Sequence, residues 1–283
     1  MKEERTPILT ASIVTFNTDV DELTKCISAL REDGIDKLWI VDNSPGNELE
    51  DSIGRLCTCM EIEYIPSHDN PGYGAAHNKA IQRAIEYGAT YHLVINSDVY
   101  FQKGTIPAIA RYMDANPQIG QLQPRIVYPD GREQYSSRLL PSPFDSIGRK
   151  FLPKRLMEKR NRRYLLSNRP EGMALDIPYH QGSFMFFRIS ALQEIGLFDE
   201  RFFMYPEDID ITRRMHRKYK TIYWPEVSVV HAHRASSYHD SRMSRIHMRN
   251  MIRYFNKWGW IFDLERIRFN RRVLREIKAS LKS

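Results

Sequence analysis

Short apolar runs and helix-like segments alternate through the first hundred residues, and this alternation restricts the chain to few folds. Residues 22–33 and the segment after Gly74 place apolar side chains at helical spacing, and Gly34 and Gly88 follow them. The apolar runs are residues 9–17, 37–43, 62–67 and 91–99. Alternation of this kind predicts an α/β fold with a mostly parallel sheet and helices on its faces.

Each of the four predicted strands ends in a short cluster that contains polar side chains. These are Thr15, Phe16 and Asn17; Asp42, Asn43 and Ser44; Asp69 and Asn70; and Asn96, Ser97 and Asp98. Ligands of open α/β sheets bind at the carboxyl ends of the strands. Four polar strand ends in succession therefore predict the rim of a binding site.

Asn96 and Asp98 stand two residues apart behind the apolar run "YHLV". On an extended strand such side chains point the same way, and their oxygen atoms suit a hard divalent cation. Asn-Ser-Asp is also ordinary turn chemistry. The residues alone leave both interpretations open.

The segment "HDNPGYGAAHN" joins a glycine-containing loop to a helix. Gly72 and Gly74 allow the backbone to approach a ligand, and the start of the helix favours an anion. The spacing differs from the dinucleotide fingerprint GxGxxG. A plain loop-to-helix junction is the alternative.

Two further motifs carry titratable groups. "FMYPEDIDITRRM" predicts a helix that begins near Pro206, with Glu207 and Asp208 in its first turn. These acids either complement the helix dipole or include a general base. "VVHAHR" places His231 and His233 after an apolar strand, where an imidazole serves as a metal ligand or as a structural residue.

Composition excludes several classes of protein. The three cysteines, Cys26, Cys57 and Cys59, lack the paired spacing of a zinc site and predict reduced thiols in a cytoplasmic protein. The first residues lack the order of a signal peptide, and no run reaches the roughly 20 apolar residues of a membrane helix. We therefore expect a soluble or peripheral protein, with no recognisable nucleic-acid motif in its body.

Positive charge is concentrated at the C-terminus. Residues 242–283 hold 12 of the 42 Lys and Arg residues but only 3 of the 35 Asp and Glu residues. In this tail, Arg245, Arg249, Arg253 and Lys257 form a stripe at helical spacing, opposite an apolar side that includes Met248 and Phe255. Such a helix either packs on the body or lies on an anionic membrane surface.

The ordered set of motifs, over about residues 8–260, resembles the inverting family-two glycosyltransferases of the GT-A fold, in particular the bacterial rhamnosyltransferase-like branch. The set comprises a strand ending in "TFN", "VDNS", "DNPGYGAAHN", "NSDV", "GSFMFFR", "FFMYPEDIDITRR" and "VVHAHRASS". The resemblance implies a nucleotide-sugar-binding half over residues 1–125 and an acceptor-binding, catalytic half over 126–241. Residues 242–283 would follow as a basic helical tail.

The resemblance also implies the roles of the site residues. Asp98, with Asn96 in place of the family's first Asp and His231 from the late motif, would hold Mg²⁺ or Mn²⁺, and His233 is the alternative histidine. Asp208 would be the base, with Glu207 its neighbour. The residues that would contact the donor are Thr15, Phe16, Asn17, Asp42, Asn43, Asn70, Gly72, Gly74, Asn78, Asn96 and Ser97.

The implied reaction is a single displacement that inverts the sugar. The donor would be a nucleoside-diphosphate sugar, with dTDP-rhamnose favoured by family likeness, and the acceptor a glycan or polyprenyl-linked glycan at the inner face of the membrane. A nucleotidyltransferase is an alternative, although the first strand lacks the glycine-rich basic loop expected of that class. A non-catalytic sugar-nucleotide-binding module is the other. The sequence does not disclose the oligomeric state.

Overall fold

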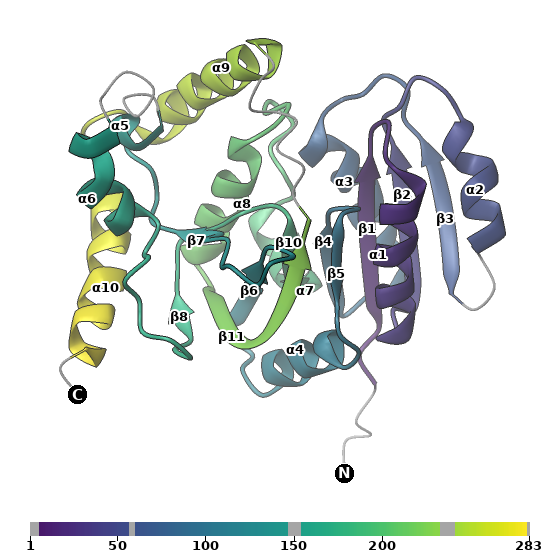
Figure 1. The fold of residues 1–283 in the computed structure, drawn as a ribbon, viewed down its shortest axis with the longest axis horizontal. Coiled ribbons are helices and arrows are strands. Elements are labelled where there is room, and N and C mark those ends of the chain that lie inside the picture. The colour runs from purple at the N-terminus through teal and green to yellow at the C-terminus, as the bar shows by residue number, and fades with distance from the viewer. Residues whose placement is uncertain (1–5, 57–59, 147–153, 233–240, 282–283) are drawn as a thin grey trace.

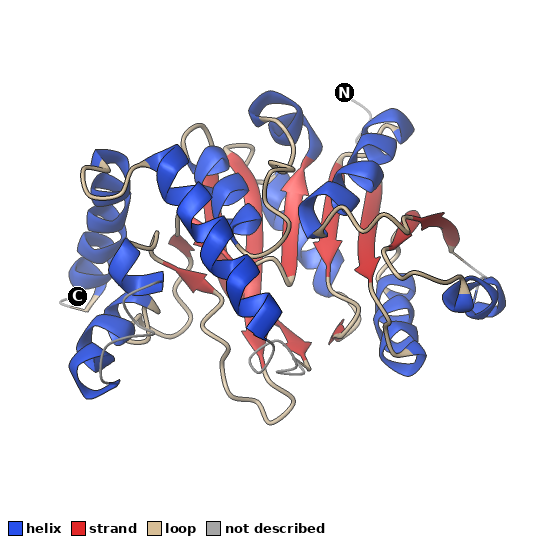
Figure 2. Ribbon diagram, turned by 90° about the horizontal axis from the view of Figure 1, so that it is seen from above, coloured by secondary structure: helices blue, strands red, loops and turns tan. Residues whose placement is uncertain are grey.

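A mixed β-sheet of nine strands forms the centre of the protein. The computed structural model describes residues 6–56, 60–146, 154–232 and 241–281 (Figure 1). Viewed from above, helices lie on both sides of the sheet (Figure 2). This arrangement confirms the predicted α/β class.

The N-terminal part of the sheet is parallel. Its strands, in spatial order, are β3 (Glu61–Pro66), β2 (Lys37–Asp42), β1 (Leu9–Thr15) and β4 (Tyr91–Ile95). The connecting helices are α1 (Val20–Glu32), α2 (Glu48–Leu56) and α3 (Tyr73–Tyr87). Asp19 caps α1 by accepting from two backbone N–H groups, and Gly88 ends α3 in the left-handed conformation.

The sheet continues with mixed pairing. Next to β4 come β10 (Phe184–Arg188), β6 (Ile119–Val127), β11 (Lys220–His231) and β5 (Val99–Phe101), while β8 (Leu175–Asp176) pairs with β11. β10 is antiparallel to both of its neighbours, whereas β6 and β11 are parallel. The sheet thus runs without interruption through both expected halves, and β6 includes residue 125.

The remaining elements frame the second half. They are α4 (Thr105–Asp114), β7 (Ser137–Arg138), α5 (Pro143–Ser146), α6 (Lys154–Tyr164), β9 (Tyr179–His180), α7 (Ile189–Ile195), α8 (Pro206–His216), α9 (Ser241–Trp258) and α10 (Leu264–Ser280). β7 and β9 form a separate two-stranded sheet. None of the described helices is long and apolar enough to cross a membrane.

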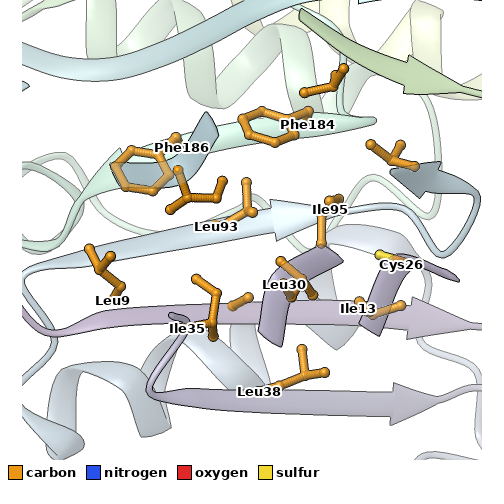
Figure 3. Close-up of a cluster of buried hydrophobic side chains, with 14 of the residues drawn as sticks. Leu9, Ile13, Cys26, Leu30, Ile35, Leu38, Leu93, Ile95, Phe184 and Phe186 are labelled. Carbon is orange, nitrogen blue, oxygen red and sulfur yellow. The ribbon is translucent and has the colours of Figure 1, made fainter. Parts of the chain in front are cut away.

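Alternate side chains of the strands pack into two separate cores. Phe184 and Phe186 of β10 join Leu30 of α1 and Leu93 of β4 on one face (Figure 3). Met185 and Phe187 point into the other core, which is built on α3, α7 and α8. Because side chains alternate along a strand, a sheet covered on both faces needs apolar residues at consecutive positions, as in "FMFF".

Candidate active site

Asn96, Ser97 and Asp98 form a turn between β4 and β5. The predicted fourth strand therefore ends at Ile95 and does not include these residues. A backbone hydrogen bond from Val99 N to the Asn96 carbonyl oxygen closes the turn at 3.3 Å. The turn interpretation is correct for the backbone, and it leaves the Asp98 side chain at the carboxyl end of the sheet.

His231 lies opposite Asp98 because β11 pairs with β5, with His231 in register with Val99. The distance from His231 Nε2 to Asp98 Oδ1 is 3.3 Å. On the other side of the ring, Nδ1 lies 2.8 Å from Gln134 Oε1. The amide oxygen accepts a hydrogen bond, so we assign the proton to Nδ1, and the Nε2 lone pair then faces Asp98.

This donor set fits a divalent cation. A carboxylate oxygen and a neutral imidazole nitrogen both accept, so a proton or a cation between them makes their approach favourable. Within the described ranges, no group of three or more His, Cys, Asp or Glu side chains is gathered for a metal. Two protein ligands suit Mg²⁺ or Mn²⁺ bound partly by substrate oxygens. His233 lies outside the described residues.

Glu207 and Asp208 begin α8 and are buried, at 4% and 6% exposure. The preceding Tyr205 has φ +90°, which is strained for a bulky side chain, and Pro206 occupies the first helical turn. Strained backbone of this kind persists only where the surrounding structure holds it in place. It is found most often at functional sites. No pattern in the sequence indicates this backbone conformation, because a residue before proline ordinarily has negative φ.

The environments of the two carboxyl groups differ. Asp208 accepts from Gly182 N at 3.0 Å and from Ile209 N at 2.7 Å. Burial raises the pKa of Asp208 to about 7, and the backbone donors and the Arg138 charge oppose that rise. Burial, followed by the Asp208 charge, raises the pKa of Glu207 well above its usual value. Among the described residues, Glu207 Oε2 has no hydrogen-bond partner.

Tyr73 links the two parts of the site. Its hydroxyl lies 3.0 Å from Asn96 Oδ1 and 2.7 Å from the carbonyl oxygen of Gly182, next to the backbone N–H that binds Asp208. Burial raises the pKa of the Tyr73 phenol, as do the charges of Glu207, Asp208 and Asp98. Its hydroxyl therefore stays protonated and donates a hydrogen bond.

Two cavities meet at this point. One, of about 770 Å³, contains Asp98, His231, Glu207 and Asp208 in its wall, together with residues of α9. The other, of about 640 Å³, is lined by Asn17, Asn96, Ser97 and others near the end of β1. Tyr73, Asn96 and Asp98 line both. The predicted metal residues thus stand between two spaces, one on the side of the N-terminal strands and one on the side of α8.

At the ends of β1 and β2, the residues predicted to contact the sugar donor mostly form hydrogen bonds with neighbouring side chains. Asp42 is fully buried and accepts from Thr15 Oγ1 at 2.9 Å, from Ser44 Oγ at 2.6 Å and from the Tyr64 hydroxyl at 2.8 Å. The Asp42 carboxylate therefore organises the strand ends. The buried Asn43 Oδ1 has no partner among the described residues and offers an acceptor to a ligand.

Several of the predicted donor residues are not among those that line the two cavities. Phe16 is exposed at the end of β1, and Asn70 adopts φ +41° in a turn. The Asn78 side chain is buried and bonds to both the N–H and the carbonyl oxygen of Phe198. A Cβ on Gly74 would contact the Phe198 side chain. Gly74 and Asn78 thus hold α3 against the segment that leads to α8.

Sequence reasoning missed Tyr73, Gln134 and Tyr205. Tyr73 stands between the two glycines of the α3 loop, which is a local signal. Gln134 lies in a segment of weak periodicity. It is 97 positions before His231 in the sequence, and only the tertiary structure brings the two side chains into contact. We found no sequence signal for it.

Comparison with solved structures identifies the fold. The chain has the fold of GT-A glycosyltransferases, including GalNAc-T7 crystallised with UDP, GalNAc and Mn²⁺ (TM-score 0.62, 14% identity, 82% of this chain and 44% of that chain). The mannosyltransferase PcManGT from Pyrobaculum calidifontis, in complex with GDP-Man and Mn²⁺, is also similar (TM-score 0.59, 15% identity, 98% and 76%). At these identities the likeness concerns the fold alone.

Sequence comparison then identifies the family. Residues 10–196 match Glycosyl transferase family 2, and the chain belongs to this family. An N-acetylglucosaminyl-diphospho-decaprenol L-rhamnosyltransferase of Mycobacterium tuberculosis is 31% identical over 191 residues, which are 62% of this chain and 60% of that protein. A low-salt glycan biosynthesis hexosyltransferase of Haloferax volcanii is 28% identical over 223 residues, 77% of this chain and 65% of that protein. The matches thus span less than two thirds of these relatives.

Proposed function

We propose that the protein transfers a sugar, with rhamnose from dTDP-rhamnose as the favoured case, from a nucleoside-diphosphate donor to a lipid-linked glycan. The observation that carries this proposal is the cavity that holds the Asp98–His231 pair and the buried Asp208 in one wall. The family membership supports glycosyl transfer, and the activity for which the mycobacterial relative is named supports the sugar and the lipid-linked acceptor.

Asp98 and His231 would hold Mg²⁺ or Mn²⁺, which are the oxygen- and imidazole-binding cations that suit a mixed site of this kind. A bound cation supplies positive charge that stabilises the departing nucleoside diphosphate. Gln134 fixes the orientation of the His231 ring, and Tyr73 fixes the Asn96 amide. The donor diphosphate would lie beside these groups, with the nucleoside toward the cavity near Asn17.

Asp208 acts as the base. It takes the proton of an acceptor hydroxyl, the oxygen attacks the anomeric carbon, and the bond from that carbon to the diphosphate oxygen breaks. One displacement inverts the configuration, so one base suffices. The N–H groups of Gly182 and Ile209 hold the Asp208 carboxylate in place, and burial keeps water away from it.

The test is Asp208→Asn, which keeps the size of the side chain and removes its ability to accept a proton. We expect transfer to fall by about 10²–10⁴-fold, while a nucleoside diphosphate with Mn²⁺ still raises the melting temperature. Asp130→Asn makes the same chemical change at an exposed carboxylate paired with Arg132 and is the control.

Asp98→Asn should instead lose the Mn²⁺-dependent nucleotide shift together with transfer. The released product decides the reaction class, since a nucleotidyltransferase releases pyrophosphate and a glycosyltransferase releases a nucleoside diphosphate. Undiminished transfer by Asp208→Asn would refute the assignment of the base.

A further inference from the structure

The turn between α9 and α10 exposes a cluster of large apolar side chains. Ile261 is 73% exposed, Phe262 91% and Leu264 77%, and the neighbouring Trp260 is 39% exposed. Contiguous exposed apolar side chains of this size on a folded protein mark a surface that something covers. We call residues 260–264 the apolar turn.

The apolar turn is held rigidly from beneath. Within it, Asp263 is buried, caps α10 and receives two hydrogen bonds from the Arg213 guanidinium, at 2.6 and 2.7 Å. The Trp258 ring lies under the same guanidinium at 4.1 Å. The buried Arg213–Asp263 pair therefore holds the backbone of the apolar turn in place. The exposure of the apolar side chains does not result from a frayed chain end.

A cationic cavity adjoins the apolar turn. Its volume is about 400 Å³, and it is lined by Arg201, Phe202, Arg253, Asn256 and Lys257. The Asn256 amide oxygen accepts from the Trp260 indole N–H at 2.8 Å, which joins this cavity to the turn. Asp199 pairs with Arg201 and Lys257, and Asp210 also pairs with Lys257. Arg253 instead donates to the Arg201 carbonyl oxygen and to the Asn250 amide oxygen, so the cavity has three cationic side chains for two neighbouring carboxylates.

The amphipathic faces of the tail helices are not available to a partner. Met251, Tyr254 and Phe255 of α9 and Phe269, Val273 and Ile277 of α10 are buried in one core with the body of the protein. α9 and α10 therefore pack on the body, as one of the two interpretations of the tail sequence expected. The apolar turn and the outer basic side chains remain exposed, as does Ile252 of α9.

We propose that the apolar turn inserts into the interface of an anionic phospholipid bilayer, while the cationic cavity binds lipid phosphate. Charge favours this partner: residues 242–283 hold 12 basic and 3 acidic residues, so a second copy would repel this surface and an anionic membrane would attract it. Insertion of aromatic and aliphatic side chains beside basic ones is the usual chemistry of interfacial binding.

The location suits the proposed function, on which the biological meaning of this inference rests. α9 lines the active-site cavity at one end, through Met243, Ser244 and His247, and leads to the apolar turn at the other. It lies along the upper edge of the molecule in Figure 1. A helix of 18 residues is about 27 Å long. A lipid-linked acceptor in the same bilayer is thereby brought near Asp208.

The experiment is sedimentation of the full chain with vesicles of phosphatidylcholine alone or mixed with phosphatidylglycerol, without donor or acceptor. We expect the protein to pellet with the anionic vesicles, and less so at high salt. The triple variant Ile261→Ser/Phe262→Ser/Leu264→Ser should partition at least about tenfold more weakly. Arg253→Gln should weaken binding to the anionic vesicles only.

The matched pair is Phe262→Ser against Leu281→Ser. Leu281 is also exposed, at 61%, but follows the far end of α10. Its substitution should leave partitioning within about twofold, because it lies outside the proposed insertion surface. Equal pelleting of the triple variant, no pelleting of the wild type, or a wild-type dimer that the triple variant abolishes would each overturn the proposal.

Transfer assays separate this inference from the proposed function. The triple variant should use a short, water-soluble acceptor at the wild-type rate and lose activity toward an acceptor held in vesicles. If the wild type transfers no sugar to either acceptor, the proposed function fails. The sedimentation result still decides by itself whether the apolar turn binds a membrane.

Discussion

Asp208 and Glu207 are neighbours on one helix, but their surroundings give them different chemistry. Asp208 has two backbone N–H donors and the nearby Arg138 charge, which favour its ionised form. Glu207 is equally buried, and its Oε2 has no partner among the described residues. Two interacting carboxyl groups in unequal environments ionise at separate pH values. This difference supports Asp208, rather than Glu207, as the proposed base.

The pH dependence of transfer tests that assignment. The pKa of Asp208 is raised from 3.8 to about 7, and a base works only without its proton. The rate at saturating substrates should therefore rise with pH through the neutral range and level off above it. A rate that stays constant down to pH 5 would contradict the assignment.

Protonation of Asp208 does not unfold the protein at low pH, so a fall in the transfer rate cannot be attributed to unfolding caused by this group. A carboxyl group whose pKa is raised in the folded state contributes stability below its unfolded value of 3.8, and this contribution is lost as the pH rises through about 7. Protonation of Asp208 at pH 5 thus favours the folded protein. Far-UV circular dichroism at pH 5 and pH 8 is the control.

Gln134 would act on the proposed metal site through His231. The amide accepts from the ring N–H at 2.8 Å and donates to the His231 carbonyl oxygen at 2.7 Å. Gln134→Leu removes both contacts at similar size, and we expect Mn²⁺ affinity to fall about 10–100-fold. Mn²⁺ titration of the nucleotide-dependent thermal shift measures it. Gln118→Leu, at an exposed position whose side-chain amide donates to Asn116 Oδ1, should have no effect.

At the scale of elements, the start of α3 depends on a close approach of two backbones. Gly72 has φ +104°, and a Cβ there would overlap the carbonyl oxygen of Phe203. The next residue, Tyr73, donates its N–H to the same oxygen at 3.0 Å. This contact places Tyr73 beside the segment that leads into α8, and so links the two halves of the site.

Gly72→Ala should therefore destabilise the protein more than Gly88→Ala. Both glycines have positive φ, but nothing lies within 4 Å of a Cβ at Gly88. We expect about 1 kcal/mol for the backbone conformation alone at Gly88 and on the order of 1–3 kcal/mol more at Gly72, where atoms overlap. Chemical denaturation measures both, and equal losses would show that the Phe203 contact does not matter.

At the scale of the whole molecule, the tail is part of the folded body. Arg213 of α8 is 1% exposed in its side chain and pairs with Asp263 and Glu265 at the start of α10. Apolar residues of α9 and α10 complete a core with Leu139, Leu140 and Tyr164. The C-terminal basic region thus packs against the body of the protein and stabilises it, while its outer surface remains exposed.

Truncation after Gly259 should consequently prevent stable folding. It leaves the Arg213 charge without either carboxylate, which costs about 3–5 kcal/mol. It also exposes one side of the core that α10 shares with Leu139, Leu140 and Tyr164. Truncation after Ser280 is the control and should keep the wild-type denaturation midpoint. A cooperative, wild-type transition of the shorter chain would show that α10 is dispensable.

Local spacing accounts for what could be predicted. Residues 22–33 and the segment after Gly74 carry their helical period, their caps and their terminal glycines within a few residues, and α1 and α3 follow them. The motif order of "NSDV", "PEDIDI" and "VVHAH" was sufficient to predict the family and the fold. It also predicted that Asp98, Asp208 and His231 share a site, and one cavity holds all three.

The sequence by itself determined α1, α3 and the four parallel strands of the N-terminal half, the fold, and the candidate groups Asp98, Asp208 and His231, because period, capping and residue type are local properties. Only the tertiary structure decided that Gln134 orients His231, that Asn78 bonds to Phe198 and that Arg213 anchors α10. These contacts join residues 97, 120 and 50 positions apart. They depend on strand register and helix packing, which arise when the whole chain buries its apolar surface.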